Sequence, residues 1–225
     1  MLTVIGADIG QLSDPTAIAV VECTPSSYPV PVLGRDPVSG LPREEETFVE
    51  GPPVTFAVRH LERPPLGTDY VRVVARIEEL SSRLPGSLLV VDATGVGLAV
   101  CDMLAETGLQ PVRVTITAGS EPQGEGLSWR VPKQRLIAGM QVALGSGRLR
   151  VAASLALAAV LVRELQDYRL KVTAAANVTF SAREGAHDDL LLAVALAVWG
   201  GQTACSQPRE VVVIEEMDRV EISPF

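Results

Sequence analysis

The chain has 225 residues, 47% of them hydrophobic, so it can bury a full core and is not generally disordered. Its formal net charge of −8 argues against a protein that coats nucleic acid non-specifically. The three cysteines form no CxxC pair, which argues against a zinc site and favours reduced thiols in the cytoplasm. The longest apolar run, 190–199, is about half of the roughly 20 residues that a membrane span requires, and no secretory signal is visible.

The chain opens on LTVIGADIG, residues 2–10, which predicts a buried strand that carries a single acid, Asp8. A carboxylate in a buried strand costs desolvation energy unless a partner neutralises it. No lysine or arginine lies nearby in the sequence, so a bound cation is a candidate for that partner. Gly6 and Gly10 would let a ligand or a second backbone come close.

A turn at 13–15 leads into a second strand, 16–22, and this spacing predicts an antiparallel hairpin. Residues 24–53 are rich in proline and are expected to form an irregular insertion before a third strand at 54–61. Thr68 is expected to cap a helix that ends at Pro85-Gly86. The apolar positions of that helix are Val71, Val74, Ile77, Leu80 and Leu84.

The strand SLLVVD, 87–92, again ends in a carboxylate, Asp92, and a glycine-rich turn then leads into a helix at 98–107. After a strand at 112–117, the glycines of 118–129 predict a mobile loop. Pro132 suits the first position of the next helix.

Ser154 is expected to cap a further helix, and a short strand is expected at 178–182. The last helix opens at His187-Asp188-Asp189 and continues apolar on every face, which predicts that it is buried. We therefore expect one domain over 1–204 and an acidic tail over 205–225. The fold class is α/β, with a mixed central sheet whose first strands are antiparallel and whose later strands are parallel, flanked by helices.

Acids gather at three points of this plan: Asp8, Asp92, and the pair Asp188 and Asp189. Sites in open α/β sheets form beyond the strand ends, where a buried helix could bring its own acids. Carboxylates brought together repel one another, and Mg²⁺ or Mn²⁺ with oxygen ligands relieves this. Two such ions, about 3.5–4 Å apart, activate water and stabilise the leaving oxygen in phosphodiester hydrolysis.

Each acid also has a purely structural interpretation, as a turn former at a strand end or a capping residue at a helix start. The joint occurrence of these acids beside unusually apolar runs favours the metal site. Adjacent helix residues point about 100° apart, so one of the pair is expected to bind metal directly, and Asp189 is favoured. His187 is expected at the edge of the cleft, rather than as a metal ligand.

The segment from 129 to 185 holds nine basic residues against three acids. These charges are either ordinary solvated helix faces or a surface that meets phosphates.

Four segments, GADIGQLSDPTAIAVVE, VVDATGVG, VPK and HDDLLLAVALAVW, resemble the nuclease domain of phage terminase large subunits. The order and spacing agree from about residue 2 to 200. The resemblance implies a ribonuclease H-like fold and two-metal endonuclease activity on double-stranded DNA during genome packaging. It implies that Asp8, Asp92 and Asp189 bind the metal ions with Asp188 beside them. It also implies that Lys133 lies near DNA, with Arg130 and Arg135 as neighbouring candidates.

The sequence contains no GxxxxGK[ST] motif, so the ATPase motor of whole terminases is missing from it. The chain is either an excised nuclease domain or a stand-alone relative. The resemblance implies a terminase ATPase domain, a portal and a small terminase subunit as further partners, and the host cytoplasm as the location.

Three alternatives stay open. A junction-resolving nuclease has the same fold, and an inactive DNA-binding module would hold DNA without cutting it. An ATP-binding protein of the sugar-kinase and actin type also begins with an Asp-x-Gly turn, but this chain looks too short for two duplicated domains.

Overall fold

The structure is a computed structural model that describes residues 1–10, 14–25, 53–174 and 187–206. The predicted strand at 178–182, most of the predicted insertion and most of the acidic tail lie outside the described residues. The elements, in chain order, are β1 (Leu2–Asp8), β2 (Ala17–Pro25), β3 (Val54–Glu62), α1 (Tyr70–Arg83), β4 (Leu88–Asp92), α2 (Gly97–Glu106), β5 (Val112–Thr117), β6 (Gln123–Glu125), β7 (Ser128–Pro132), α3 (Lys133–Gly145), β8 (Leu149–Val151), α4 (Ala158–Ala174) and α5 (Asp189–Ser206).

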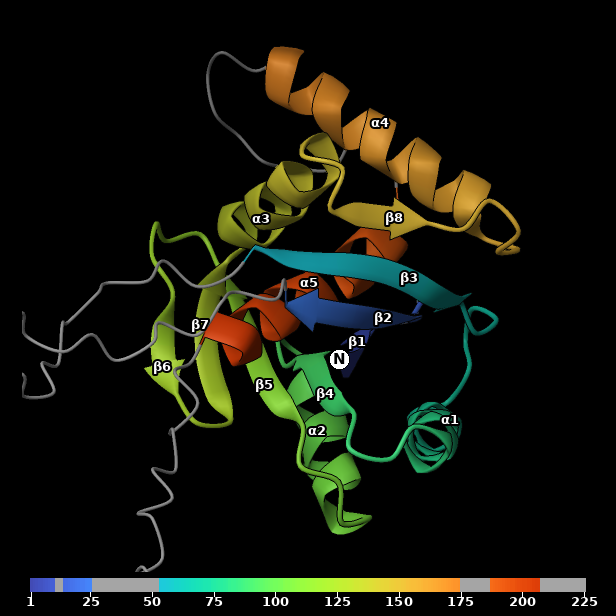
Figure 1. The fold of residues 1–225 in the computed structure, drawn as a ribbon. Helices are drawn as coiled ribbons and strands as arrows, with labels where there is room; N and C mark the ends of the chain where they lie inside the picture. The colour runs from blue at the N-terminus through green and yellow to red at the C-terminus, as the bar shows by residue number, and fades with distance from the viewer. Residues whose placement is uncertain (11–13, 26–52, 175–186, 207–225) are drawn as a thin grey trace, which may run out of the picture.

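Within the described residues, one sheet of eight strands forms in the order β6-β7-β5-β4-β1-β2-β3-β8 (Figure 1). The pairs β1–β2 and β2–β3 are antiparallel, whereas β1–β4, β4–β5, β5–β7 and β3–β8 are parallel. This confirms the predicted mixed sheet and the hairpin between the first two strands.

Helices cover both faces of this sheet. One apolar cluster joins α1 and α2 to side chains from one face of β1, β2 and β4. A second, larger cluster joins α3, α4 and α5 to the opposite face. Helices and sheet therefore form three layers, as is typical of α/β proteins in which each element buries its apolar side against another.

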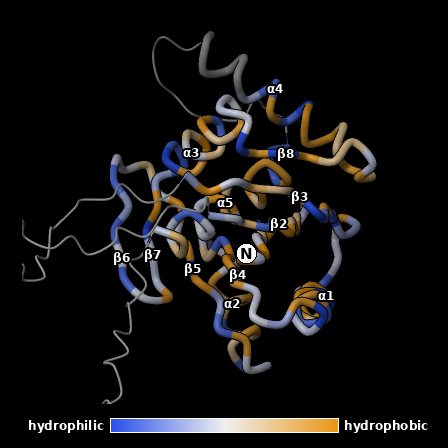
Figure 2. The backbone as a smooth tube through the Cα atoms, viewed as in Figure 1, coloured by the Kyte–Doolittle hydropathy of each residue, from blue (hydrophilic) through white to orange (hydrophobic). Residues whose placement is uncertain are grey.

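Helix α5 lies at the centre of the larger cluster and is apolar along most of its length (Figure 2). Its length and its mean hydropathy of 1.3 would suit a membrane span, yet 67% of it is buried inside the protein, as in a core helix. The helix passes so close to β1 that a Cβ on Gly6 would lie 2.1 Å from the Ala193 carbonyl oxygen. Gly6 therefore admits a second backbone, one of the two alternatives expected for it.

The predicted loop at 118–129 is wrong in part, because β6 and the start of β7 pair there as a hairpin. Every residue of β6 is exposed, so the strand has no buried face and leaves no alternating apolar pattern in the sequence. The short strand β8 was likewise not predicted, and it pairs with β3.

Some predicted helix boundaries also differ from the structure. Asp69 caps α1 in place of Thr68, since its side chain accepts the Arg72 N–H. Val73 is buried in that helix, whereas Val71 is exposed. Helix α4 begins at Ala158, so Ser154 lies in the preceding turn and does not cap the helix.

Candidate active site

Asp8 and Asp92 end two neighbouring strands. Asp8 is the last residue of β1 and Asp92 the last residue of β4. These strands pair in parallel, with Ala7 opposite Val91, so the two acids follow one another across the same edge of the sheet. Paired strands lie about 4.8 Å apart, which puts the two carboxylates in adjacent positions beyond the sheet.

The turn after β4 fixes the Asp92 side chain. Its Oδ1 accepts the Thr94 N–H at 2.8 Å, and the Thr94 hydroxyl accepts the Ile116 N–H at 2.9 Å. A Cβ on Gly97 would lie 1.8 Å from the Asp92 carbonyl oxygen, so only glycine fits where the chain enters α2. The glycines of the VVDATGVG segment therefore serve to fold the chain tightly behind this acid.

The start of α5 brings the other two acids to the same edge. Asp189 is the first residue of the helix and is only 6% exposed. Asp188 immediately precedes it and accepts a hydrogen bond from Lys133 Nζ at 2.7 Å. Lys133 opens α3, so the VPK and HDD segments meet in space.

The electrostatics of Asp8 indicate that the other three aspartates lie close enough to affect its ionisation. Burial raises the pKa of Asp8 well above its ordinary value, and the charges of Asp92, Asp189 and Asp188 raise it further. Lys133 partly offsets this increase. Burial also raises the pKa of Asp92, against the opposing hydrogen bonds from Thr94.

Two further charged residues, Arg63 and Glu164, complete the cluster and were missed in the sequence. Arg63 follows β3, and its Nη2 donates to Glu164 Oε1 and lies 3.2 Å from Asp189 Oδ2. Glu164 lies on α4 and is only 6% exposed. The sequence does contain a sign that Glu164 is buried. It is spaced three and four residues from Leu161 and Tyr168, which puts it on the apolar side of its helix.

The donor set suits a hard divalent cation. Burial raises the pKa of Asp189, although Arg63 and His187 oppose the increase, so its charged form lacks full compensation. Its Oδ2 is buried and accepts no hydrogen bond, because the nearby Arg63 makes an ion pair without hydrogen-bond geometry. Mg²⁺ and Mn²⁺ favour carboxylate oxygens as ligands, and a buried oxygen that accepts no hydrogen bond is free to bind such an ion.

The side chains are nevertheless not yet arranged around a single ion. Among the described residues, no three His, Cys, Asp or Glu side chains are grouped so that they could hold one metal together. Asp188 is engaged by Lys133, and Asp189 by Arg63. A bound ion would therefore compete with side-chain cations for these two carboxylates.

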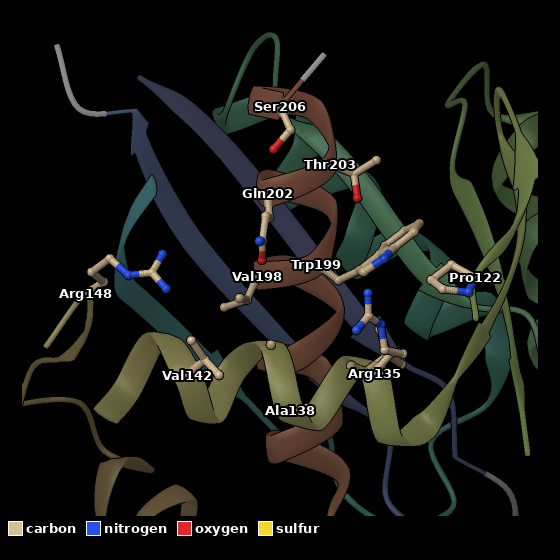
Figure 3. A pocket seen from close by; sticks show the side chains of 12 residues that line it. Pro122, Arg135, Ala138, Val142, Arg148, Val198, Trp199, Gln202, Thr203 and Ser206 are labelled. Carbon is tan, nitrogen blue, oxygen red and sulfur yellow. The ribbon is translucent and has the colours of Figure 1, made fainter. Parts of the chain in front are cut away.

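The other predicted residues lie around or away from this cluster. His187 is exposed, with its Nδ1 3.9 Å from Asp189 Oδ2, which places it at the edge of the acids. Arg130 is exposed on β7. Arg135 lines a cavity of about 670 Å³ between α3 and the C-terminal half of α5, beside Trp199 and Gln202 (Figure 3). That cavity is lined by none of the four aspartates, so Arg135 is not part of the carboxylate cluster.

No protein-family model and no curated protein matches this sequence. Two solved structures of the large terminase nuclease from thermophilic phage G20c are similar to the chain. The form with bound cobalt aligns with a TM-score of 0.55 at 23% identity, covering 88% of this chain and 80% of that chain. A second form aligns with a TM-score of 0.52 at 22% identity, covering 87% and 80%. The chain therefore has the ribonuclease H-like fold of large terminase nucleases, as the sequence resemblance implied.

Proposed function

We propose that this protein is a metal-dependent endonuclease that cleaves double-stranded DNA. The proposal rests on one observation: Asp8, Asp92 and the pair Asp188 and Asp189, far apart in the sequence, converge at one edge of the sheet. A likeness of fold alone does not require this, because unrelated functions share folds and differ in their sites. The cobalt bound in one of the similar nucleases supports a divalent ion in this type of site.

Asp8, Asp92 and Asp189 would hold the ions, with Asp188 beside them. Two Mg²⁺ or Mn²⁺ ions, when bound, would supply an activated water and stabilisation of the leaving oxygen. The ends of β1 and β4 position two of these acids, and the N-terminus of α5 positions the third. Lys133 holds Asp188 in place through its hydrogen bond and adds a positive charge at the edge that DNA would approach.

Charge balance favours two ions over one. Asp8, Asp92, Asp188, Asp189 and Glu164, if ionised, outnumber the cations Lys133 and Arg63 by three charges. Two divalent ions would more than neutralise this excess, and the remaining positive charge would attract one phosphate of the DNA backbone.

In a packaging complex, an ATPase domain, a portal and a small terminase subunit would be the partners of this nuclease.

The test is cleavage of supercoiled and linear DNA by the purified chain with Mg²⁺, with Mn²⁺ and with EDTA. We expect cleavage with either ion, none in EDTA, and at least about 100-fold less cleavage in D8N, D92N and D189N. D102N is the matched control, because Asp102 is 60% exposed on α2 and pairs only with Arg113 among the described residues. Full activity in EDTA would refute the proposal.

A four-way junction as a third substrate separates the two nuclease alternatives. A packaging nuclease should cut linear duplex at least as fast as a junction, whereas a resolvase should prefer the junction. DNA binding without cleavage under any of these conditions would instead indicate an inactive binding module.

A further inference from the structure

Arg63 brings a permanent positive charge next to the acids that would bind the metal ions. It stands immediately after β3, opposite both the start of α5 and helix α4. Its Nη2 atom contacts Glu164 Oε1 and lies 3.2 Å from Asp189 Oδ2. A guanidinium does not lose its proton in proteins, so this charge stays at every physiological pH.

Glu164 links Arg63 to the helix that carries Asp189. Its Oε2 accepts the Leu191 N–H in the first turn of α5 at 2.9 Å, while its Oε1 accepts from Arg63. The glutamate is therefore bonded at once to the arginine and to the helix that carries Asp189. The same Nη2 atom of Arg63 is therefore shared between the carboxylates of Glu164 and Asp189.

We propose that Arg63 is a tethered cation that weakens the binding of divalent ions at Asp189, and that Glu164 moderates this effect. The inference rests on the proposed metal-dependent function. A divalent ion on Asp189 must share the carboxylate with the guanidinium and bear the repulsion between the two positive charges. Before ions arrive, the same arginine partly neutralises the buried aspartate and so stabilises the folded chain.

Opposite effects of the two partners distinguish this role from simple structural support. Mn²⁺ binding to the DNA-free protein is measured by isothermal titration calorimetry at constant pH. In R63Q, loss of the competing charge should tighten Mn²⁺ binding by at least about fivefold. In E164Q, the side-chain amide can still accept the Leu191 N–H but no longer holds the guanidinium, so Mn²⁺ binding should weaken by at least about threefold.

Two controls accompany these variants. R63K keeps the charge and should stay within about twofold of the original chain. R59Q and E22Q remove a pair of the same kind, 2.7 Å apart and joining β3 to β2, and should leave Mn²⁺ affinity unchanged. Thermal unfolding of each variant checks that it is folded.

Each outcome decides the inference. Tighter binding in R63Q together with weaker binding in E164Q supports it. A change in the same direction in both variants, or a fivefold tightening in R63K, overturns it while leaving the proposed nuclease intact. Absence of Mn²⁺ binding in the unsubstituted chain overturns the proposed function and this inference together.

Discussion

At the scale of single residues, the main feature is that carboxyl groups are held where they are costly to ionise. Burial raises the pKa values of Asp8, Asp92, Asp189 and Glu164, and mutual repulsion raises that of Asp8 further. The folded chain therefore binds protons that the unfolded chain has released. Stability that depends on such groups is greatest below the unfolded pKa and is lost as pH rises through the folded pKa.

The raised pKa values of these carboxyl groups give a prediction for the metal-free protein. In EDTA, the free energy of unfolding should fall as the pH rises from about 5 toward 8, because unfolded carboxyls are already ionised there. The pKa values of Glu62 and Glu79 are lowered in the folded chain, so their contribution to the free energy of unfolding has reached its full value by about pH 5. They therefore do not reverse the expected fall of that free energy with pH. Urea unfolding followed by circular dichroism at each pH measures it.

D8N is the matched variant for this measurement, because its amide cannot ionise. It should be more stable than the original chain in EDTA at pH 8, by about 1 kcal/mol or more, and should show a shallower pH slope. A stability that rises from pH 5 to 8 in EDTA would contradict the assigned repulsion.

The acids of the proposed site stand out as candidates in the sequence, as does Lys133, whereas Arg63 and Glu164 do not. Asp8, Asp92 and Asp189 each interrupt or begin an apolar run, so a buried charge is visible along the chain itself. Arg63 follows a strand in which polar residues alternate, so it looks like one more solvated charge. Its partners, Glu164 and Asp189, lie more than 100 residues away in the sequence, and only the folded chain brings them together.

At the scale of elements, the packing of α5 onto β1 and β2 positions the site. The helix contacts β1, β2 and β4, and its first residue reaches the edge where β1 and β4 end. An apolar run without a polar face predicted this burial correctly. Strand β6 was missed for the opposite reason, since it lies at the edge of the sheet and all of its residues are exposed.

The close approach at Gly6 predicts a strong effect of one methyl group. G6A places its Cβ against the Ala193 carbonyl oxygen and the Ala197 N–H, both backbone atoms that cannot rotate away. We expect a loss of about 3 kcal/mol in the free energy of unfolding, with weaker metal binding because α5 is pushed from β1. Urea unfolding and Mn²⁺ titration measure the two effects.

G139A is the control for this substitution. Gly139 lies in the middle of α3, and its Cβ would meet only the Gln202 side chain at 3.9 Å. Alanine there should stabilise the protein by about 0.5–1 kcal/mol through helix propensity. If G6A were as well tolerated as G139A, the contact between α5 and β1 would be looser than the structure shows.

At the scale of the whole molecule, folding stability and metal binding should be linked. The acids at one edge of the sheet carry an excess of negative charge in the folded protein. A ligand that binds and neutralises these acids therefore favours the folded state. At a Mn²⁺ concentration 100 times its dissociation constant, the free energy of unfolding should rise by about 2.7 kcal/mol. Thermal unfolding with and without Mn²⁺ checks this, and D92N should show little of the increase.

The convergence of distant acids on a common cation is tested most directly by a crystal of the protein soaked with Mn²⁺ and examined by anomalous diffraction. We predict two manganese peaks at the end of β1 and β4, with Asp8 and Asp92 bound to them and Asp189 turned from Arg63 toward the metal. Peaks elsewhere on the surface, with Asp189 still paired to Arg63 and no metal at Asp8, would contradict the metal site and the nuclease built on it.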